Sequence, residues 1–523
     1  MDIPHASRGA PRIMPSPAPL AVPSLAAASA SGVAILLALL LPSGPAGAAS
    51  PARPSAAERP NIIVIIADDL GIPDLGTYGL SKEAVPTPNL DRLARRGVTF
   101  TRGYATASVC SPSRAALLTG QYQQRHGFEF LTPENADAGN QGLTPGQRVF
   151  AADLKATGYR TAIIGKWHLG ATPDRLPTAR GFDQFFGFLP GETAYIRGGT
   201  PGTTSVRAPY LGDRSFTRKV DWVQLMRDRA GDAAPPVVEP DDTKYLTDWF
   251  TSEAVQFIEG GGGKPGRKGG RREPYFLYLA HLAPHSPFQA LDSDTAPFGH
   301  IADPLRRTYA GMIRALDRSV GAVLDAVERS PDRDNTLIVF TADNGAATYM
   351  GVSDCDSLAG GKLSYFEGGA RVPLFVSWPA RWPAGRVDAR NVSLLDIAPT
   401  ALAAAGAKSG VVFDGVDLTP RMQPGREREV VHETLFWRTG PEFAVLAGDM
   451  KLLSNTRPGA YPWLFDVAAD PTERSSLTFQ RPSVVEDLMR RRSAWEAQMK
   501  PPAWPATKVY QIFQCGRISY HEQ

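Results

Sequence analysis

Apolar runs without polar interruptions recur along this chain, and each is followed by a cluster of polar residues. The first is Ile62–Ile66 in "PNIIVIIADDLG", and similar runs lie at 161–164, 274–280 and 337–340. A β-branched run that is apolar on both faces is typical of a strand buried on both sides of a parallel sheet. Segments with apolar residues at helical spacing alternate with these runs, at 89–96, 148–157 and 306–330.

This alternation of strand and helix predicts an α/β fold, in which helices on both sides cover a large, mostly parallel mixed sheet. The pattern changes after about residue 410, where we expect a hairpin at 443–455, a strand and turn at 461–477, and a helix at 482–499. These elements predict a small C-terminal α+β subdomain. We therefore expect a catalytic domain at 59–410 and a C-terminal subdomain at 411–523.

The first 48 residues differ from the rest of the chain. Arg8 and Arg12 precede an apolar run, Val33–Leu41, that is too short to span a bilayer comfortably, and the small residues that follow it end at Ala48. This order is typical of a secretory signal peptide at 1–48, with a retained membrane anchor as the alternative. We expect an exported protein, periplasmic or extracellular, without stable membrane insertion once the signal is cleaved.

Composition narrows the function classes only slightly. The chain has 523 residues, is 43% hydrophobic and carries a net charge of +3, so no overall basic field favours nucleic acid as a partner. Residues 259–273 are rich in Gly, Arg and Lys, which is typical of a mobile loop, and a patch that binds a polyanion is the alternative. Residues 195–240 are also rich in loop-forming residues.

The chain has three cysteines, too few for a disulfide framework. Cys110 is a core residue, half of a disulfide, a thiolate nucleophile, a metal ligand or the precursor of another group. If Cys110 has a chemical role, Cys355 and Cys515 are the one pair left, and two free buried thiols are the alternative. The stretch "SPSRAALLTGQ" predicts a helix directly after Cys110, with Ser111 or Ser113 as its N-cap.

Two pairs of oxygen-bearing residues follow apolar strands, Asp68/Asp69 after the first run and Asp343/Asn344 in "TADNG". The carboxyl ends of strands are where open α/β sheets place their sites. Four carboxylate or amide ligands suit a hard divalent cation such as Ca²⁺ or Mg²⁺ rather than Zn²⁺. A cap or a turn would explain either pair alone, whereas two pairs in the same context favour a metal site.

Basic and imidazole side chains follow other strands. Lys166 and His168 lie two residues apart in "IIGKWHLG", so in an extended chain they share a face, while His285 lies in "LAPHSPF" and Lys362 in "LAGGKLSYFEGGARVP". Each alone would be a structural or surface residue. Together they predict an anionic substrate bound beside the metal. A cysteine protease is a poor fit, because paired aspartates and a hard cation have no place in its chemistry.

Several motifs resemble those of the formylglycine-dependent (type I) sulfatases. The stretch "CSPSRAALLTGQ" resembles their C-x-P-x-R signature and "GYRTAIIGKWHLG" their second signature, and the likeness extends through "TPNLDRLARRGVTFTRGYA", "GFDQFFGF" and "WLFDVAADPTERSSL". It covers nearly the whole chain after the signal and is nearest to the arylsulfatase A and N-acetylgalactosamine-6-sulfatase branch. The resemblance implies an alkaline phosphatase-like fold and hydrolysis of the sulfate ester of an aryl compound or a sugar.

The resemblance also implies how the site residues act. A formylglycine-generating enzyme would oxidise Cys110 to formylglycine, the hydrated aldehyde would attack sulfur, and sulfate would leave by C–O cleavage. The implied ligands of Ca²⁺, which we favour over Mg²⁺, are Asp68, Asp69, the modified Cys110, Asp343 and Asn344. The implied catalytic residues are Cys110, Arg114 (holding the modified residue), Lys166 (binding sulfate), His168 (taking a proton from the second hydroxyl), and His285 and Lys362 (serving the leaving alcohol).

One stretch departs from the family pattern. Residues 188–196, "FLPGETAYI", lack the Ser or His that family members often carry there, so Glu192 and Thr193 are unassigned candidates. Phe185, Phe186 and Tyr195 either line a substrate pocket or, as we favour, pack in the core. Two rival functions stay open: a phosphonate monoester or phosphodiester hydrolase on the same fold, and a non-catalytic calcium-binding relic, against which the complete set of site residues argues.

Overall fold

The computed structural model describes residues 59–132, 141–207, 225–231, 237–238, 241, 244–260, 273–454 and 461–522. The expected signal peptide at 1–48 lies outside these residues, as do 261–272 of the basic loop and much of 195–240. Residues 53–523 form one compact unit. Within the described part of that unit, no helix is long and apolar enough to cross a membrane.

Helices occur where the apolar residues recur at helical spacing. The longest, α6, begins behind Asp303, whose side chain accepts a hydrogen bond from the amide of Leu305 and so caps the first turn. The α-helices of the described residues are α1 (Pro88–Arg96), α2 (Cys110–Thr119), α3 (Phe150–Ala156), α4 (Leu246–Glu259), α5 (Asp292–Thr295), α6 (Pro304–Glu328), α7 (Glu367–Ala370), α8 (Ile397–Ala405) and α9 (Pro482–Glu496).

The strands of the described residues form one large sheet and three small ones. In chain order they are β1 (Asn61–Ala67), β2 (Val98–Tyr104), β3 (Arg160–Lys166), β4 (Gln184–Phe188), β5 (Thr203–Val206), β6 (Leu225–Arg229), β7 (Val237–Val238), β8 (Tyr275–Ala280), β9 (Phe288–Leu291), β10 (Thr336–Ala342), β11 (Arg371–Ser377), β12 (Arg386–Asp388), β13 (Val392–Ser393), β14 (Leu435–Thr439), β15 (Glu442–Ala447), β16 (Met450–Ser454), β17 (Trp463–Asp466), β18 (Val509–Gln514) and β19 (Arg517–Glu522).

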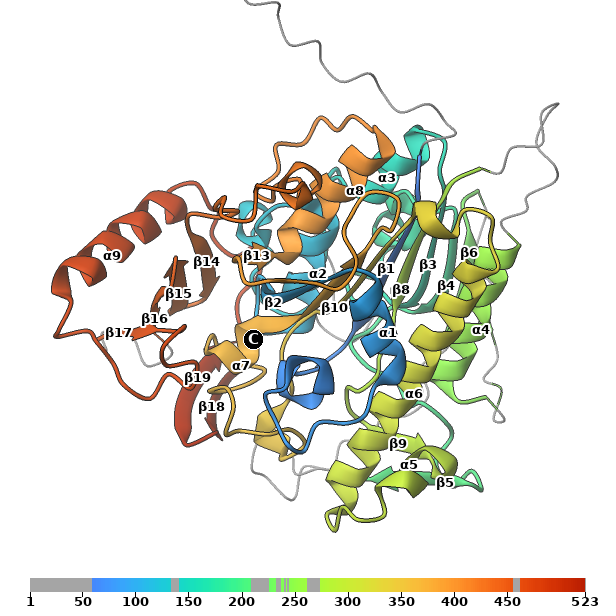
Figure 1. Ribbon diagram of the computed structural model, residues 1–523, viewed down its shortest axis with the longest axis horizontal. Helices are drawn as coiled ribbons and strands as arrows, with labels where there is room; N and C mark the ends of the chain where they lie inside the picture. Colours follow the sequence, from blue (N-terminus) through green and yellow to red (C-terminus); the bar gives the residue numbers. More distant parts are fainter. Residues whose placement is uncertain are drawn as a thin grey trace, which may run out of the picture. The chain divides into compact units, whose positions relative to one another are not determined.

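The large sheet confirms the expected α/β fold. Its strands follow the order β12-β2-β11-β10-β1-β8-β3-β4-β6-β7, with β13 beside β2. The central strands β10, β1, β8, β3 and β4 are parallel, whereas β11 and β6 are antiparallel to their neighbours. Helices α1 and α4 each contact α6 on one side of the sheet, and α2, α3 and α8 contact one another on the other (Figure 1).

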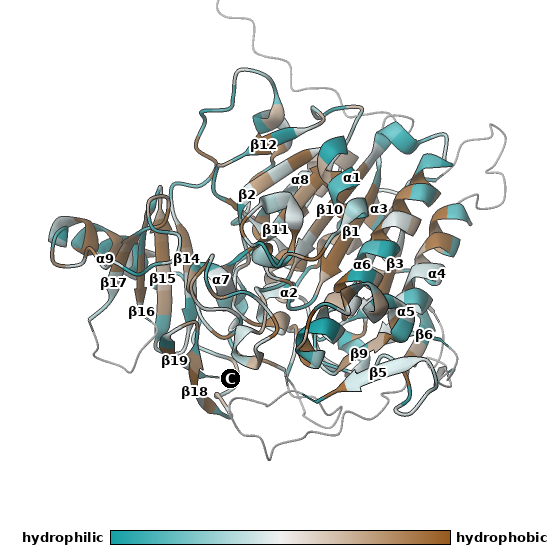
Figure 2. Cartoon of the chain, turned by 60° about the horizontal axis from the view of Figure 1, so that its bottom comes forward, coloured by the Kyte–Doolittle hydropathy of each residue, from teal (hydrophilic) through white to brown (hydrophobic). Residues whose placement is uncertain are grey.

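The core lies between this sheet and its two helical layers. Every residue of β1, β8 and β10 is buried, as their apolar sequences require for strands covered on both faces. Figure 2 shows these central strands as mostly hydrophobic, with hydrophilic residues on the helices around them. A rigid, doubly covered sheet of this kind fixes the positions of the side chains at its strand ends.

The chain after residue 411 contains the expected antiparallel elements. β14, β15, β16 and β17 form a four-stranded sheet against which α9 packs, and β18 and β19 form a hairpin. The expected boundary between residues 410 and 411 stays a prediction. Cys355 and Cys515 form a disulfide, which answers the question that the sequence left open and ties the β18–β19 hairpin to a loop of the main fold.

Two local expectations were wrong. Helix α2 begins at Cys110 itself, and Val109 is its N-cap without a side-chain hydrogen bond, so neither Ser111 nor Ser113 caps it. The strand expected at 161–164 continues to Lys166, and His168 has a left-handed φ of 59°. The shared face of Lys166 and His168 was expected for an extended chain, whereas the strand ends at Lys166 and the backbone of His168 is left-handed.

Candidate active site

The polar residues that follow the central strands meet at one edge of the sheet. β1 and β10 pair in parallel with Ala67 opposite Ala342, so Asp68 and Asp343 leave the sheet side by side. β8 and β3 run parallel to β1 and end at the same edge. The parallel register thus brings together residues that are far apart in the sequence, as expected for the carboxyl edge of an α/β sheet.

The expected metal ligands are buried and carry oxygen atoms with spare hydrogen-bonding capacity. The amide nitrogen of Asn344 donates to Asp69 Oδ1 at 2.7 Å, which fixes the orientation of the Asn344 side chain. Oδ1 of Asp343 and Oδ1 of Asn344 are buried without a hydrogen-bond partner among the described residues. Buried acceptors normally have a partner, and carboxylate and amide oxygens are ligands of Ca²⁺. The residues present therefore fit a hard cation.

A tight cluster of possible ligand atoms supports the same position. One ligand atom each of Asp68, Asp69, Cys110 and His285 lie within 4.8 Å of one another. This cluster contains three residues of the expected ligand set and adds His285, which the sequence suggested only as a catalytic residue. Asp343 follows the strand next to Asp68 and so lies beside the cluster.

Two lysines pair with the aspartates of this cluster. Lys166 Nζ lies 2.5 Å from Asp68 Oδ2, and Lys362 Nζ lies 2.8 Å from Asp69 Oδ1 and 3.5 Å from Cys110 Sγ. Burial alone would raise the pKa of Asp68, but Lys166 and the neighbouring cations outweigh it and hold that pKa well below its usual range. Burial works against the charge of Lys362 too, but Asp69 raises its pKa well above the usual value. The negative charge of each aspartate is thus balanced by an ammonium group in contact with it.

Arg114, on α2, holds the two strand ends together. Its Nε lies 2.7 Å from Asp343 Oδ2, its Nη2 lies 3.3 Å from Asp68 Oδ2, and its Nη1 donates to the backbone oxygen of Lys166 at 3.2 Å. Burial and the charge of Asp68 raise the pKa of Asp343 to about 6, against the effect of Arg114. The guanidinium therefore organises the carboxylates rather than facing solvent.

Cys110 is a buried thiol at the first position of α2. Its Sγ lies 3.2 Å from Asp68 Oδ1. Burial raises the pKa of the Cys110 thiol far above its usual range, and the charge of Asp68 adds to this, although Lys166 and Lys362 oppose it. A thiol that stays protonated is a poor nucleophile and a poor ligand for a hard cation. This environment argues against a cysteine-hydrolase role for the unmodified side chain.

The two expected histidines lie at the same site, and burial lowers the pKa of each. Burial, followed by Lys362, lowers the pKa of His285 to about 4, and burial with Lys166 lowers the pKa of His168 well below its usual value. His285 Nδ1 lies 2.6 Å from the backbone oxygen of Ser286, and Nε2 lies 3.6 Å from Asp69 Oδ2. Because a backbone oxygen only accepts, Nδ1 carries the proton in the neutral ring and Nε2 faces the cluster as an acceptor.

Comparisons with known proteins agree with this geometry. Residues 60–407 match the model of the family described as Sulfatase. The chain belongs to the sulfatase family. It is 32% identical to N-acetylgalactosamine-6-sulfatase of Canis lupus familiaris, with 88% of this chain and 89% of the relative covered, and 34% identical to arylsulfatase A of Bos taurus, with 83% and 82% covered. Like these relatives, it is a sulfuric ester hydrolase.

Solved structures show the same fold. The crystal structure of Ps i-CgsB in complex with k-i-k-neocarrahexaose superimposes with a TM-score of 0.73 at 34% identity, covering 85% of this sulfatase and 94% of that chain. The phosphonate monoester hydrolase of Agrobacterium radiobacter superimposes with a TM-score of 0.58 at 22% identity, covering 84% and 96%, which shows a shared fold alone. The alkaline phosphatase-like architecture of this sulfatase is thereby confirmed.

Sequence reasoning missed residues that support the site from a distance in the chain. The Tyr309 hydroxyl, on α6, lies 3.2 Å from the backbone oxygen of Asp69 and donates to Asp74 Oδ2 at 2.8 Å. Asp74 also accepts a hydrogen bond from Ser353. No local motif marks this group in the sequence, because 235 and 279 residues separate Asp74 from Tyr309 and from Ser353, and they meet only in the folded sulfatase.

The aromatic residues considered for a substrate pocket have different places. Phe185 and Phe186 are buried in the core, and Phe186 packs against Trp249, as we favoured. Tyr195 is also buried, but its hydroxyl donates to the backbone oxygen of His285 at 2.9 Å. Tyr195 is therefore part of the support of the site.

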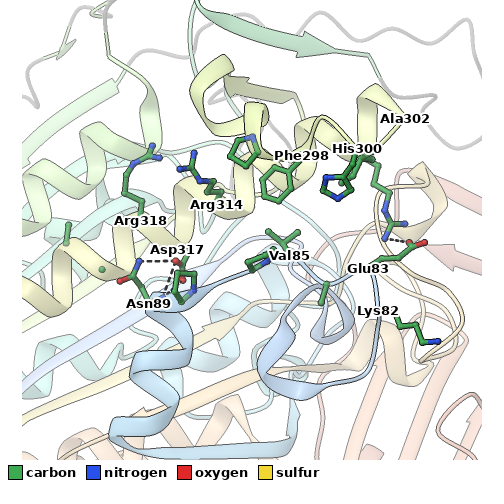
Figure 3. Close-up of a pocket in the computed structure, with 18 of the residues that line it drawn as sticks. Lys82, Glu83, Val85, Asn89, Phe298, His300, Ala302, Arg314, Asp317 and Arg318 are labelled. Atoms are coloured by element: carbon green, nitrogen blue, oxygen red, sulfur yellow. Dashed lines mark hydrogen bonds and ion pairs between the residues drawn. The ribbon is translucent and has the colours of Figure 1, made fainter.

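A cavity of about 1140 Å³ lies elsewhere, between α1, α6 and the loops that precede them (Figure 3). Its lining includes Val85 and Phe298, together with arginines such as Arg318. Arg318 forms ion pairs with Asp248 and Asp294. None of the expected site residues lines this cavity, so the sulfatase site is not located there.

Proposed function

We propose that this sulfatase cleaves sulfate esters of sugars or aryl alcohols with a formylglycine made from Cys110 and a bound Ca²⁺. The observation that carries the proposal is the environment of Cys110. A protonated, buried thiol lies between a carboxylate and an ammonium, 3.2 Å from Asp68 Oδ1 and 3.5 Å from Lys362 Nζ. This position suits an oxygen-bearing side chain beside a metal far better than it suits a thiol.

Asp68, Asp69, Asp343 and Asn344 would hold Ca²⁺, because they supply the buried oxygen atoms at this edge. The unpartnered Oδ1 atoms of Asp343 and Asn344 support this assignment among the residues that the structure describes. When bound, Ca²⁺ supplies a hard positive charge that polarises oxygen. A formylglycine at position 110 supplies, as its hydrate, one hydroxyl for attack on sulfur and a second that allows sulfate to be eliminated.

The remaining side chains bind the sulfate and move protons. Lys166 and Lys362 would neutralise sulfate oxygens as charge develops on them. His285 faces the cluster through Nε2 and, with Lys362, would serve the oxygen of the leaving alcohol. His168 would take a proton at residue 110 during release of sulfate. Arg114 would hold the carboxylates of Asp68 and Asp343 in fixed positions, since it forms ion pairs with both.

Sugar sulfates are the substrate class that the relatives favour. One relative is named N-acetylgalactosamine-6-sulfatase, and Ps i-CgsB was solved with a neocarrahexaose. We propose the same broad class here. Maturation would require a formylglycine-generating enzyme as a partner, and the expected signal peptide would direct the protein to the periplasm or the cell exterior.

The decisive experiment is mass spectrometry of the peptide that contains residue 110, from protein made with and without a formylglycine-generating enzyme. We expect the sulfur to be replaced by an aldehyde oxygen only in the first preparation, together with turnover of 4-nitrophenyl sulfate that a calcium chelator removes and Ca²⁺ restores. Cys110→Ser should lose multiple turnover. An unmodified thiol in an active enzyme, or faster turnover of an aryl phosphodiester, would overturn the proposal.

A further inference from the structure

The segment 189–196 runs over the site and contacts both of its histidines. The backbone amide of His168 donates to the oxygen of Leu189 at 3.0 Å. A Cβ added at Gly191 would lie 2.9 Å from Nε2 of His168, so the backbone of Gly191 lies directly against that ring. At the other end of the segment, the Tyr195 hydroxyl reaches the backbone oxygen of His285. The residues between these contacts are held next to the catalytic centre.

Glu192 is the charged residue of this segment. Its Cα is one trans peptide, about 3.8 Å, from the Cα of Gly191. The side chain is half-buried, and burial raises the pKa of its carboxyl. The charges that act on the carboxyl belong to the site itself: Lys166 and Lys362 lower its pKa, and the two aspartates after β1 raise it. Glu192 therefore directly follows a residue that lies against the His168 ring, and its carboxyl lies within electrostatic range of both lysines of the site.

Glu192 differs in kind from the residues that bind sulfate. A carboxylate repels the sulfate oxygens, so it does not serve that end of the substrate. An ionised carboxylate is an acceptor only, and its natural partners are hydroxyl or ammonium groups. A sugar sulfate carries hydroxyl groups close to its ester, such as the C4 hydroxyl of galactose 6-sulfate, whereas a simple aryl sulfate carries none.

We propose that Glu192 is a specificity-determining residue that accepts a hydrogen bond from a hydroxyl of the sugar next to the sulfate ester. The proposal rests on the sulfatase function proposed above and narrows its substrate class. The preferred substrates are sugar sulfates with a free neighbouring hydroxyl. Sugars with a second sulfate or a carboxylate at that position are disfavoured, because a second anion would lie against Glu192.

The test compares kcat/KM for galactose 6-sulfate with kcat/KM for 4-nitrophenyl sulfate in wild type and in Glu192→Gln. A hydrogen bond to a charged group supports a change of about ten- to one hundred-fold in the ratio of the two values, in favour of the aryl substrate. Glu83→Gln is the matched control, because Glu83 pairs with Arg306 beside the remote cavity, and it should leave the ratio unchanged. An unchanged ratio in Glu192→Gln would refute the proposal.

A second arm changes the substrate as well as the enzyme. The 4-deoxy analogue of galactose 6-sulfate lacks the C4 hydroxyl, the one nearest to the ester, and wild type should lose the same factor on it. Glu192→Gln keeps a neutral carbonyl acceptor and should distinguish the two sugars by a smaller factor than wild type does. Equal rates of wild type on both sugars would also contradict the proposal that Glu192 accepts a hydrogen bond from that hydroxyl. If wild type hydrolyses 4-nitrophenyl sulfate but no sugar sulfate, this inference fails alone. If it hydrolyses neither, the proposed function fails as well.

Discussion

Replacing Lys451 by methionine tests a buried ion cluster that joins the C-terminal sheet to the site. Lys451 lies on β16, and its Nζ lies 2.8 Å from Glu367 Oε1 and 3.1 Å from Glu473 Oε1, with all three side chains fully buried. Glu367 is the first residue of α7, and its amide donates to Glu473 Oε2 at 2.6 Å. The change Lys451→Met keeps most of the length of the side chain but removes the cation that Glu367 and Glu473 share, and leaves Glu367 with Arg371, whose Nη1 lies 3.7 Å from Glu367 Oε2.

The expected cost follows from this burial. Removing one partner of a buried ion cluster leaves uncompensated charge and costs about 3–5 kcal/mol. Because unfolding entropy is about 2.1 cal/mol/K per residue, a cooperative unit of this size has about 1 kcal/mol/K, and Tm should fall by about 3–5 °C. A variant in which Glu367 and Glu473 are also changed to glutamine removes the two buried carboxylates as well and should recover most of the loss.

The loss should depend on pH in a defined direction. Burial and the neighbouring Glu367 raise the pKa of Glu473 to about 7 even with Lys451 present. A carboxyl whose pKa is raised in the folded state contributes its full stability below its unfolded pKa, and that contribution disappears as pH rises through the folded value. Without Lys451 this effect grows, so the gap in Tm between wild type and Lys451→Met should be larger at pH 8 than at pH 5.

Differential scanning calorimetry at both pH values measures these changes directly. Lys500 is an exposed lysine of the C-terminal region and provides the matched control. Lys500→Met should leave Tm within about 1 °C of wild type, as surface substitutions usually do. A wild-type Tm for Lys451→Met, or a gap that widens toward acid pH, would show that the buried cluster does not stabilise the fold as argued.

Two further predictions concern the loops around the site. The Cys355–Cys515 bond joins residues 160 positions apart, so the double variant Cys355→Ser/Cys515→Ser should lower the free energy of unfolding by about 2–5 kcal/mol, and a calorimetric Tm equal to that of wild type would contradict this. A Cβ at Gly345 would collide with the backbone oxygen of Gly368, so Gly345→Ala should displace the adjoining Asn344. We expect Ca²⁺ binding, measured by titration calorimetry, to weaken at least about tenfold. An unchanged affinity would show that Asn344 is not a ligand.

The sequence predicted the large sheet well because its strands are apolar on both faces. The run Ile62–Ile66 and the following Asp68 were sufficient to place β1 and the edge where it ends. The end of β3 at Lys166 was predicted less well, since strand length there depends on pairing with β4 and β8 rather than on local composition. The N-cap of α2 was wrong for a similar reason: the Ser111 hydroxyl accepts a hydrogen bond from the amide of Thr132, 21 residues further along, instead of one from its own helix.

Motifs identified the chemical groups of the site, but only the fold shows how they are connected. That Lys166 pairs with Asp68, and Lys362 with Asp69, is not readable from spacing, because 98 and 293 residues separate the partners. The supporting Tyr309 carries no motif at all. The residues that act chemically can be recognised in the sequence, because charged and imidazole side chains directly after apolar strands are uncommon. The residues that orient them cannot be recognised there, because only their contacts in the folded protein distinguish them.

The arrangement of α7 explains why the sulfatase site needs the chain beyond residue 410. Lys362 precedes α7 by a few residues, and the amide of Gly345, next to Asn344, donates to the oxygen of Gly369 inside α7. The position of α7 is in turn fixed by the contact between Glu367 and Lys451 of β16. One short helix thus connects a lysine of the site, an expected metal ligand and the C-terminal sheet. A chain cut at the expected boundary would lose Lys451, the partner that holds α7 in place. The C-terminal elements are therefore needed to keep the site residues next to α7 in position.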